Sequence, residues 1–313
     1  MTEDRSAPGG SSTSPPRPSP SSSRWEPGSS TSASPGEAGL GSGAIRDLAR
    51  RHGIRPTKSL GQHFLIDPNL ARAVAAEARA GPGVRIVEVG AGLGSLTVAL
   101  AATGATVLAI EFDRALLPAL EEVTASLPSV RVLHADALRL EWAAELGVGP
   151  WTLCANLPYN IAVPVVLDTL AEVPAIDRWV VMVQREVGER LVARPGDEHF
   201  GAVSLRVAYR ASASIARRVP ASVFWPRPNV DSVVVRADRL EASPVAVDER
   251  SLRRVVDGAF AERRKTMRNA LRRLGLGADE ADAVLSSCGV APNARPEELD
   301  LATFAAIAER MPA

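Results

Sequence analysis

Apolar and polar positions divide most of the chain into short apolar runs that alternate with segments of helical spacing. The apolar runs are too short for buried helices and predict strands at residues 85–90, 106–111, 130–136, 151–156, 178–184, 204–212, 214–220 and 232–238. Between them, apolar residues recur at helical intervals and predict helices at 44–53, 67–81, 95–104, 115–127, 165–173 and 185–194. This alternation is typical of an α/β fold with a doubly wound sheet of parallel strands, buried on both faces.

The pattern changes near both ends of the chain. Residues 1–43 consist mainly of Ser, Pro, Gly and Thr, with Trp25 and Leu40 among their few large apolar side chains. Such a segment cannot bury enough apolar surface to offset the entropy of ordering, so we predict that it is disordered. The α/β domain is then predicted at 44–239. Only helical patterns follow a short linker, which predicts a small all-helical domain at 240–313.

Composition limits the classes of protein open to this chain. Its 36 Lys and Arg residues balance 36 Asp and Glu residues, and it has two cysteines and four histidines. Their positions provide neither a disulfide framework nor the ligand spacing of a metal site, and so few cysteines favour a reducing compartment. No apolar run is long enough to span a bilayer, and no signal-peptide core is visible. We therefore expect a soluble, cytoplasmic protein without a bound metal.

Positive charge is concentrated in one part of the predicted helical domain. Residues 250–273 hold nine Lys or Arg residues against only two acids, Asp257 and Glu262. A local basic surface on a neutral protein indicates a polyanionic partner. A charge run can also be the solvated face of a helix, and the charge alone leaves both interpretations open.

A glycine-rich loop, VEVGAGLGSLT at residues 87–97, ends a predicted strand and opens a helix. Ser95 stands where a dinucleotide fingerprint has its third glycine, so the loop allows close approach of a ligand without the pyrophosphate geometry. The loop resembles the first motif of S-adenosylmethionine-dependent methyltransferases, in which Gly90 and Gly92 would border the cofactor. For the loop alone, a tight strand-to-helix turn is the alternative.

Two acids follow at the ends of the next two predicted strands, Glu111 and Asp136. The carboxyl ends of parallel strands meet at one edge of a sheet, where ligands of such folds bind. Glu111 could accept hydrogen bonds from both ribose hydroxyls of an adenosine, and Asp136 could accept one from the adenine amino group. Glycines and strand-end acids in this order favour a cofactor site over a plain turn.

The tetrapeptide Asn156-Leu157-Pro158-Tyr159 ends the predicted strand at 151–156 and should reach the same edge. An adenine amino nitrogen becomes nucleophilic as it pyramidalises, and two acceptors for its N–H groups favour that change. The Asn156 side chain and the Leu157 carbonyl could be those acceptors, with Pro158 keeping Leu157 extended. Tyr159 could stack on a base flipped out of its helix. Such a sequence alone is typical of a turn, but after the glycine loop it predicts a site that acts mainly by positioning.

The ordered part of the chain resembles the ribosomal RNA adenine N6,N6-dimethyltransferases. The resemblance rests on eight segments, at 58–65 (KSLGQHFL), 87–97, 109–113 (AIEFD), 134–138 (HADAL), 156–160 (NLPYN), 184–191 (QREVGERL), 223–235 (VFWPRPNVDSVVV) and 260–271 (FAERRKTMRNAL). It implies a Rossmann-like S-adenosylmethionine methyltransferase domain followed by a helical RNA-binding domain.

The resemblance also implies a role for each matching residue. His63 and Leu65 would close over the methionine end of the cofactor, and Asn156 would lie where cofactor and target meet. Phe224 would stack on the face of the target base opposite Tyr159. The residues that depart from those common in the family are His63, Ala91 and Ala135. No acid or amide that the chemistry needs is lost, so the resemblance implies an active enzyme.

The function implied is dimethylation of two adjacent adenosines in the 3′-terminal hairpin loop of 16S rRNA, in the 30S subunit or its precursor, by a monomer. Phosphate contacts would come from Arg263, Arg264, Lys265 and Arg268. Three alternatives remain: a 23S rRNA dimethyltransferase that confers antibiotic resistance, a non-catalytic ribosome assembly factor, and a DNA adenine methyltransferase. Segments 223–235 and 260–271 favour the 16S enzyme over the 23S enzyme. Glu111, Asp136 and Asn156 argue against a purely binding role.

Overall fold

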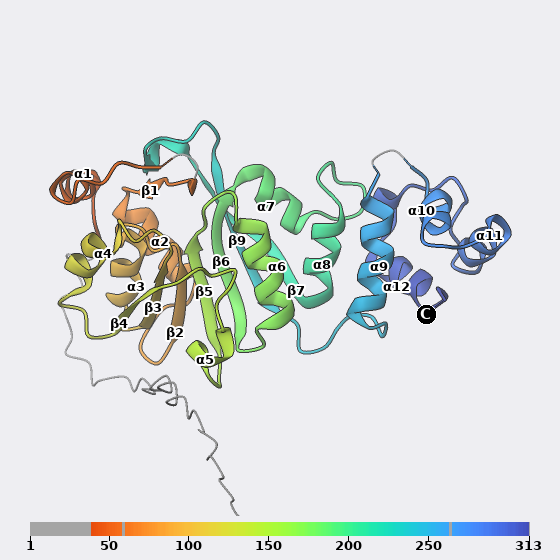
Figure 1. The fold of residues 1–313 in the computed structure, drawn as a ribbon, viewed down its shortest axis with the longest axis horizontal. Coiled ribbons are helices and arrows are strands. Elements are labelled where there is room, and N and C mark those ends of the chain that lie inside the picture. Colours follow the sequence, from red (N-terminus) through yellow and green to blue (C-terminus); the bar gives the residue numbers. More distant parts are fainter. Residues whose placement is uncertain (1–38, 58–59, 263–264, 313) are drawn as a thin grey trace, which may run out of the picture.

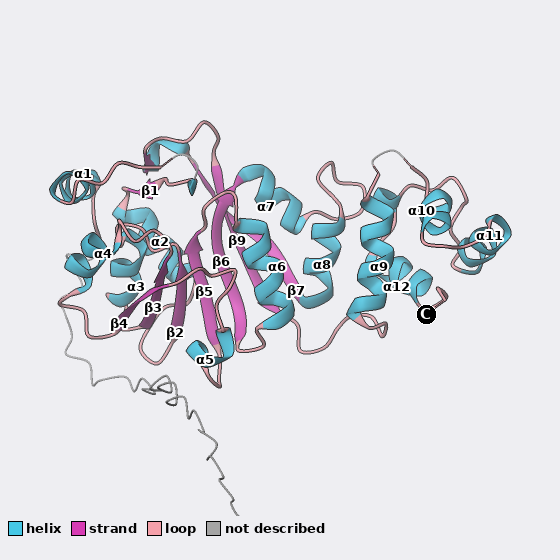
Figure 2. Ribbon diagram, viewed as in Figure 1, coloured by secondary structure: helices cyan, strands magenta, loops and turns pink. Residues whose placement is uncertain are grey.

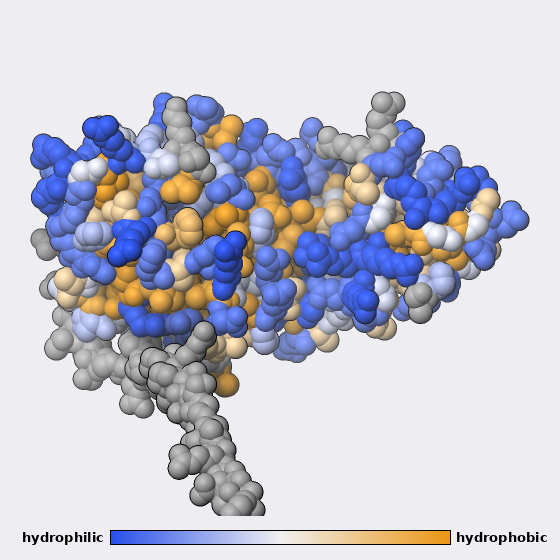
Figure 3. All heavy atoms as spheres, in the orientation of Figure 1, coloured by the Kyte–Doolittle hydropathy of each residue, from blue (hydrophilic) through white to orange (hydrophobic). Residues whose placement is uncertain are grey.

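The computed structural model describes residues 39–57, 60–262 and 265–312 of the 313-residue chain. A sheet with helices on both faces forms one end of the molecule, and helices from α9 (Glu249–Phe260) onward form the other (Figures 1 and 2). Hydrophilic side chains cover most of the face seen in Figure 3, and hydrophobic ones show mainly over the sheet. Disorder was predicted for residues 1–43, of which 1–38 lie outside the described residues. The predicted limit is slightly too late, because α1 (Ser42–Arg51) already includes residues 42 and 43.

Seven strands form the main sheet in the order β4-β3-β2-β5-β6-β9-β7. Their bounds are β2 Arg85–Val89, β3 Thr106–Glu111, β4 Val130–His134, β5 Trp151–Asn156, β6 Ile176–Gln184, β7 Ala211–Val219 and β9 Ser232–Arg239. Strands β2 to β6 are parallel as predicted, but β9 pairs antiparallel with both β6 and β7. The prediction of a wholly parallel sheet is therefore wrong, because β7 and β9 are joined without the crossover helix that parallel neighbours need.

Apolar residues cover both faces of the sheet, as a doubly wound fold requires. Neighbouring residues of one strand alternate between the faces, so that Ile86 belongs to one buried cluster and Val87 to the other. The first face packs against α2 Pro68–Glu77, α3 Ser95–Ala101 and α4 Leu117–Thr124. The second packs against α5 Trp142–Leu146, α6 Ala162–Glu172, α7 Arg185–Val192 and α8 Ala202–Arg210. The prediction of a doubly wound α/β fold is confirmed.

One predicted strand, at 204–212, is wrong. Residues 202–210 form α8, and strand β7 begins only at Ala211. Leu205 and Tyr209 face the helical end of the molecule, whereas Val207 faces the sheet. A helix buried on two opposite sides places apolar residues at every second position, which is also the pattern of a strand.

The C-terminal part of the chain is helical, as predicted. It contains α9, α10 Met267–Arg273, α11 Ala278–Ser287 and α12 Leu301–Ala308. Its apolar cluster extends back into α8, and the Tyr209 hydroxyl donates a hydrogen bond of 3.0 Å to the Val247 carbonyl. The packing of this part therefore begins before the predicted boundary at residue 240. None of the helices in the described ranges has the length and apolar character needed to cross a bilayer.

A second, two-stranded sheet pairs β1 (Phe64–Leu65) with β8 (Phe224–Trp225) in antiparallel fashion. It joins the segment before α2 to the connection between β7 and β9. The Ser95 hydroxyl at the start of α3 donates to the Leu65 carbonyl at 2.5 Å, which attaches this small sheet to the end of the glycine-rich loop. Three segments far apart in the sequence thus meet at the carboxyl edge of the main sheet.

Candidate active site at the carboxyl edge of the sheet

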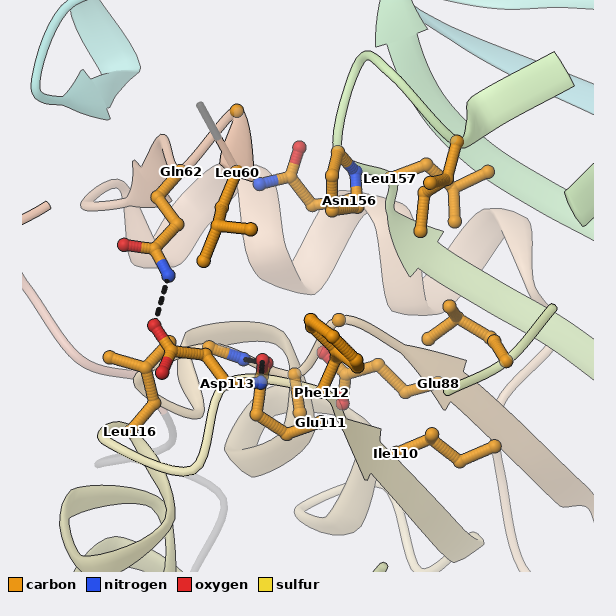
Figure 4. A pocket seen from close by; sticks show the side chains of 18 of the residues that line it. Leu60, Gln62, Glu88, Ile110, Glu111, Phe112, Asp113, Leu116, Asn156 and Leu157 are labelled. Carbon is orange, nitrogen blue, oxygen red and sulfur yellow. Dashed lines mark hydrogen bonds between the residues drawn. The ribbon is translucent and has the colours of Figure 1, made fainter. Parts of the chain in front are cut away.

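A cavity of about 240 Å³ opens at the carboxyl ends of β2, β3 and β5. It is lined by residues of 60–65, 88–96, 110–116, 135–138 and 156–161. Figure 4 shows side chains from these separate segments converging on one space. Ten of the eleven residues predicted for cofactor and target line it: His63, Leu65, Gly90, Gly92, Glu111, Asp136, Asn156, Leu157, Pro158 and Tyr159.

The glycine-rich loop packs closely against the other cavity segments. Gly90 and Gly92 have φ angles of 73° and 60°, in the left-handed region that favours glycine. A Cβ atom at Gly90 would lie 3.2 Å from Pro158, and one at Gly92 would lie 3.2 Å from Phe64. Glycine is favoured at both positions, because any other residue would strain the backbone and force Pro158 or Phe64 to shift by a few tenths of an ångström.

Glu111 closes this loop and keeps part of its carboxylate for a ligand. Its side chain is buried, and its two oxygens accept hydrogen bonds from the backbone N–H groups of Gly92 (2.7 Å) and Asp113 (2.8 Å). Burial raises the pKa of Glu111, and these hydrogen bonds counteract the rise. A carboxylate has about four acceptor positions, so each oxygen retains one for a hydroxyl. This geometry suits the ribose role predicted for Glu111.

Asp136 lies two residues beyond β4 rather than at its end. Its carboxylate accepts a hydrogen bond of 3.0 Å from the Leu138 N–H group and lies 3.8 Å from Arg139. The cavity beside it is lined by Phe112 and Leu138, which are 58% and 43% exposed. Exposed apolar side chains beside a carboxylate suit a planar base with an amino group. Neither Phe112 nor Leu138 was among the predicted site residues, although an aromatic residue directly after a strand-end acid was a usable signal.

Glu88 is a third acid on the cavity wall, and sequence analysis assigned it no role. Its side chain is 1% exposed, and the Thr97 hydroxyl donates to its carboxyl at 2.6 Å. The pKa of Glu88 is raised to about 8, mainly by burial. The Thr97 hydrogen bond counteracts this rise, and the charge of Glu111 adds to it. The signal in the sequence was an acid inside the apolar strand RIVEV. Burying a carboxyl without a cation nearby is costly, so an acid at such a position indicates a role at the site.

The amide of Asn156 has one possible orientation. Its Nδ2 group donates a hydrogen bond of 2.9 Å to the His63 carbonyl, which can only accept. The Oδ1 atom is therefore the end of the amide left to accept from a ligand. The Leu157 N–H group donates to the Met182 carbonyl at 3.1 Å, and no donor within the described residues occupies the Leu157 carbonyl. Two neighbouring acceptors thus remain, as the sequence predicts.

Tyr159 and His63 bring two loops together beside these acceptors. Their ring centroids lie 5.3 Å apart with the planes inclined by 32°. His63 Nδ1 lies 2.7 Å from the Pro226 carbonyl, so this nitrogen carries the proton. The Tyr159 hydroxyl lies 3.4 Å from the Ser232 hydroxyl, and burial raises the pKa of Tyr159. The rings therefore join the segments around 63, 159 and 226 into one wall.

Phe224 does not reach the cavity, and the prediction that it stacks on the target base is wrong for this structure. It is 3% exposed and lies opposite Leu65 in the two-stranded sheet. Its side chain belongs to the buried cluster on one face of the main sheet. Pairing with β1 turns Phe224 into the core, which the Phe-Trp-Pro sequence alone does not reveal.

A hydrogen bond closes one side of the cavity. Gln62 Nε2 donates to Asp113 at 2.6 Å, a contact drawn in Figure 4, while Gln62 Oε1 accepts from the Thr57 N–H group at 2.8 Å. The segment leading to His63 is thereby attached to the loop after Glu111. Sequence analysis did not identify this contact, because its two partners come from distant segments.

The residues predicted to bind RNA phosphates are only partly described. Arg263 and Arg264 lie outside the described residues, and Lys265 is exposed. Arg268 forms a bidentate ion pair with Asp282, at 2.6 and 2.7 Å. Contrary to the prediction, Arg268 is therefore not a free cation.

Taken together, the cavity fits the predicted cofactor. Glu111 supplies acceptors for ribose hydroxyls, Asp136 an acceptor beside exposed apolar side chains, and the glycines a close backbone wall. His63 and Leu65 lie on the wall formed by the 60–65 segment, and their contact with the methionine end stays a prediction. Among the described residues, no group of three or more His, Cys, Asp or Glu side chains is placed to hold a metal ion.

Two kinds of similarity relate this chain to known proteins. The family model described as ribosomal RNA adenine dimethylase matches residues 54–312. A protein of Thermobifida fusca named ribosomal RNA small subunit methyltransferase A is 46% identical over 273 residues, which cover 86% of this chain and 94% of that protein. A protein of the same name from Streptomyces griseus is 44% identical over 283 residues, covering 88% and 96%.

Solved structures share the fold. A dimethyladenosine transferase from Plasmodium falciparum has a TM-score of 0.67 at 22% identity, covering 78% of this chain and 96% of that chain. The 23S rRNA methyltransferase ErmE has a TM-score of 0.62 at 24% identity, covering 79% and 98%. Because the family model spans most of the chain and the relatives match along nearly their whole length, this chain belongs to the ribosomal RNA adenine dimethylase family and is an S-adenosylmethionine-dependent methyltransferase.

Proposed function

We propose that this enzyme dimethylates the N6 amino groups of two adjacent adenosines in the 3′-terminal hairpin loop of 16S rRNA. It would act as a cytoplasmic monomer on the 30S subunit or its precursor. The observation that carries the proposal is a pair of acceptors beside the cofactor cavity, Asn156 Oδ1 and the Leu157 carbonyl, to which no group of the described residues donates.

The chemistry follows from what these groups can accept. The cofactor, when bound, supplies a methyl group on a sulfonium sulfur, which is already a strong electrophile. In the first transfer, Asn156 Oδ1 and the Leu157 carbonyl accept the two N–H groups of adenine and favour pyramidal nitrogen; in the second, one of them accepts the single N–H group that remains. The nitrogen lone pair then points away from the ring and can attack. The proton leaves after the nitrogen has gained positive charge, so no general base is needed before attack, and catalysis is mainly positioning.

Delivery of the base requires that it leave its helix or loop stack. Tyr159 lines the cavity beside Asn156 and offers an aromatic face for a flipped base. His63 supports this face from the other side, and its Nδ1 proton on the Pro226 carbonyl holds the imidazole in place. Stacking on one aromatic ring contributes about 1–3 kcal/mol per base.

The choice of small-subunit RNA is supported by the relatives. Both the Thermobifida fusca and the Streptomyces griseus proteins are named as small-subunit methyltransferases, and the alignments run along nearly all of each protein. The resemblance to the 23S enzyme is at 24% identity and supports the fold alone.

Mass spectrometry of rRNA fragments tests this function. Undermethylated 30S subunits are incubated with the protein and S-adenosylmethionine, and 50S subunits and duplex DNA are treated in parallel. We expect two neighbouring adenosines of the 16S 3′ hairpin each to gain two methyl groups. Methylation of 23S rRNA alone would favour the 23S enzyme, methylation of DNA a DNA adenine methyltransferase, and no methylation a non-catalytic assembly factor. Each of these results would reject the proposal.

Burial of Phe224 leads to a prediction that separates packing from base stacking. Phe224→Ala should lower the free energy of unfolding by about 3–5 kcal/mol, because it leaves a cavity in the core. Phe224→Leu should fold and keep most methyl transfer, because an apolar side chain of similar size still fills the site. Tyr159→Leu should instead fold normally and lose transfer. Denaturant unfolding and label transfer to 30S subunits measure both effects, and a stable but inactive Phe224→Leu enzyme would restore the stacking role.

A further inference from the structure

Three exposed arginines lie at or near the same edge of the sheet as the cavity. Arg217 and Arg218 are on β7, the edge strand of the sheet, and Arg227 is on the connection that leads to β9. Within the part of the chain that the structure describes, the side chains of these three residues have no hydrogen bond or ion pair. They are called the rim arginines below.

Strand pairing fixes the distance from the acceptor site to β7. Asn156 on β5 pairs with Met182 on β6, which pairs in turn with Val234 on β9. Arg217 on β7 pairs with Val234 and completes this row across the sheet. The row spans three strand separations, so Arg217 lies roughly 14 Å from Asn156.

The β7 strand also has the right direction. It is antiparallel to β9, which is antiparallel to β6, so β7 runs parallel to the cavity strands. Its carboxyl end, with Arg217 and Arg218, therefore lies on the edge that carries Asn156. The pairing shifts register between Ile215 and Arg217, and both arginines remain exposed. Neighbouring side chains of a strand alternate, so Arg217 lies on the face of its partner Val234 and Arg218 on the opposite face, and the two arginines flank the edge strand from both sides.

Arg227 approaches the cavity by a different route. It follows Pro226, whose carbonyl accepts the hydrogen bond from His63 on the cavity wall. The base of this connection is closed by a hydrogen bond of 3.0 Å from the Ala221 N–H group to the Asp231 carboxylate. Arg227 is thus held on an ordered loop beside the aromatic wall.

Neighbouring arginines on this side of the molecule are already neutralised. Arg185 at the start of α7 lies 3.7 Å from Glu189, and Arg236 on β9 lies 3.7 Å from Glu77. Among the described residues, the rim arginines are therefore the cations on this side of the cavity that no acid neutralises. Cations without acidic partners attract phosphate groups most strongly, because no competing carboxylate must be displaced.

We propose that the rim arginines bind the RNA phosphates that flank the target adenosine and so hold the strand while its base is flipped. This rests on the proposed rRNA substrate and adds a second RNA surface, separate from the basic helical segment. A single-stranded loop has flexible phosphates, and a distance of roughly 14 Å from the acceptors is suited to nucleotides next to the target. The rim arginines give affinity and position rather than sequence discrimination.

The test measures salt dependence of binding to two probes, a 16S 3′-hairpin RNA and undermethylated 30S subunits. The triple variant Arg217→Ala/Arg218→Ala/Arg227→Ala should weaken hairpin binding about 10- to 100-fold in 0.1 M salt. The slope of log Kd against log salt should fall by about 2, since each lost phosphate contact removes roughly 0.7 for single-stranded nucleic acid. Binding of S-adenosylhomocysteine should stay within about twofold and shows that the variant is folded.

A matched control is available at the opposite edge of the sheet. Arg79 is exposed, follows α2 and has a φ angle of 53°, which asparagine tolerates. Arg79→Asn removes one positive charge and should leave both the slope and the affinity unchanged, in contrast to Arg227→Ala alone. This comparison separates a local contact from a change in net charge.

Three results would overturn the proposal that the rim arginines bind RNA phosphates. An unchanged slope in a folded variant that still methylates 30S subunits rejects the rim arginines as phosphate contacts and leaves the proposed function intact. Weaker binding to 30S subunits without any change on the hairpin identifies a ribosomal protein as the partner instead of RNA. If the unaltered protein neither binds nor methylates either probe, the proposed function fails and this inference fails with it.

Discussion

Asn156→Ala is expected to lower methyl transfer to 30S subunits about 100- to 1,000-fold, the loss typical when one preorganised polar group is removed from an active site. The structure supplies the reason. Asn156 Nδ2 is bound to the His63 carbonyl, so Oδ1 is held in place as an acceptor before the substrate arrives. Alanine removes this acceptor and leaves the Leu157 carbonyl alone to favour pyramidal nitrogen. Label transfer under single-turnover conditions measures the loss.

Binding should survive the same substitution, because the phosphate contacts lie elsewhere. Particle binding by Asn156→Ala should therefore remain within about threefold of the unaltered enzyme. Asn293→Ala is the matched control, since Asn293 is an exposed amide outside the cavity, and its side chain has no hydrogen bond within the described part of the chain. It should keep nearly full transfer. Undiminished transfer by Asn156→Ala would remove the catalytic assignment.

Glu88→Gln should make the protein more stable at high pH and flatten the dependence of its stability on pH. Burial raises the pKa of Glu88 from 4.5 to about 8. Between these values the folded protein holds a proton that the unfolded chain has released, so stability falls as pH rises through this window. The stability lost across this window totals on the order of 5 kcal/mol. Glutamine mimics the protonated carboxyl and avoids that loss.

Denaturant unfolding of both proteins from pH 4.5 to 9 measures the effect. The difference in free energy of unfolding should be smallest at the acidic end and grow by several kcal/mol toward pH 9, in favour of Glu88→Gln. Burial also raises the pKa of Glu111, so the difference between the two curves is needed to isolate Glu88. Glu309→Gln, at an exposed carboxyl, controls for replacing an acid with an amide. Parallel curves for Glu88→Gln and the unaltered protein would contradict the burial argument.

Part of the fold was predictable because local patterns encode it. Short apolar strands alternating with helices indicated a doubly wound sheet. The structure agrees, since the neighbours Ile86 and Val87 belong to apolar clusters on opposite faces of the sheet. The direction of β9 had one signal in the sequence, the lack of a predicted helix between the strands at 214–220 and 232–238. The apolar pattern of a buried strand carries no such information, because it is the same whether the neighbours run parallel or antiparallel. Helix α8 was mistaken for a strand because it is buried on two sides and so has apolar residues at every second position, as a strand does.

The errors at the site have a common physical cause. Phe224 was assigned to the target base from the family resemblance, yet it pairs with Leu65 of β1 and is buried. Arg268 was assigned to phosphate, yet Asp282, on another helix, occupies its guanidinium. In both cases the partner lies far away in the sequence, and an aromatic or basic residue is ambiguous until that partner is known.

The sequence by itself determined which polar residues reach the carboxyl edge of the sheet. Glu111 and Asn156 end parallel strands, and parallel strands bring their ends to one edge whatever the details of packing. Only the tertiary structure decided how those groups are aimed. The Asn156 amide is oriented by the carbonyl of His63, 93 residues earlier in the chain, and Phe224 is turned inward by Leu65. Orientation depends on contacts between distant segments, and local sequence patterns carry no record of them.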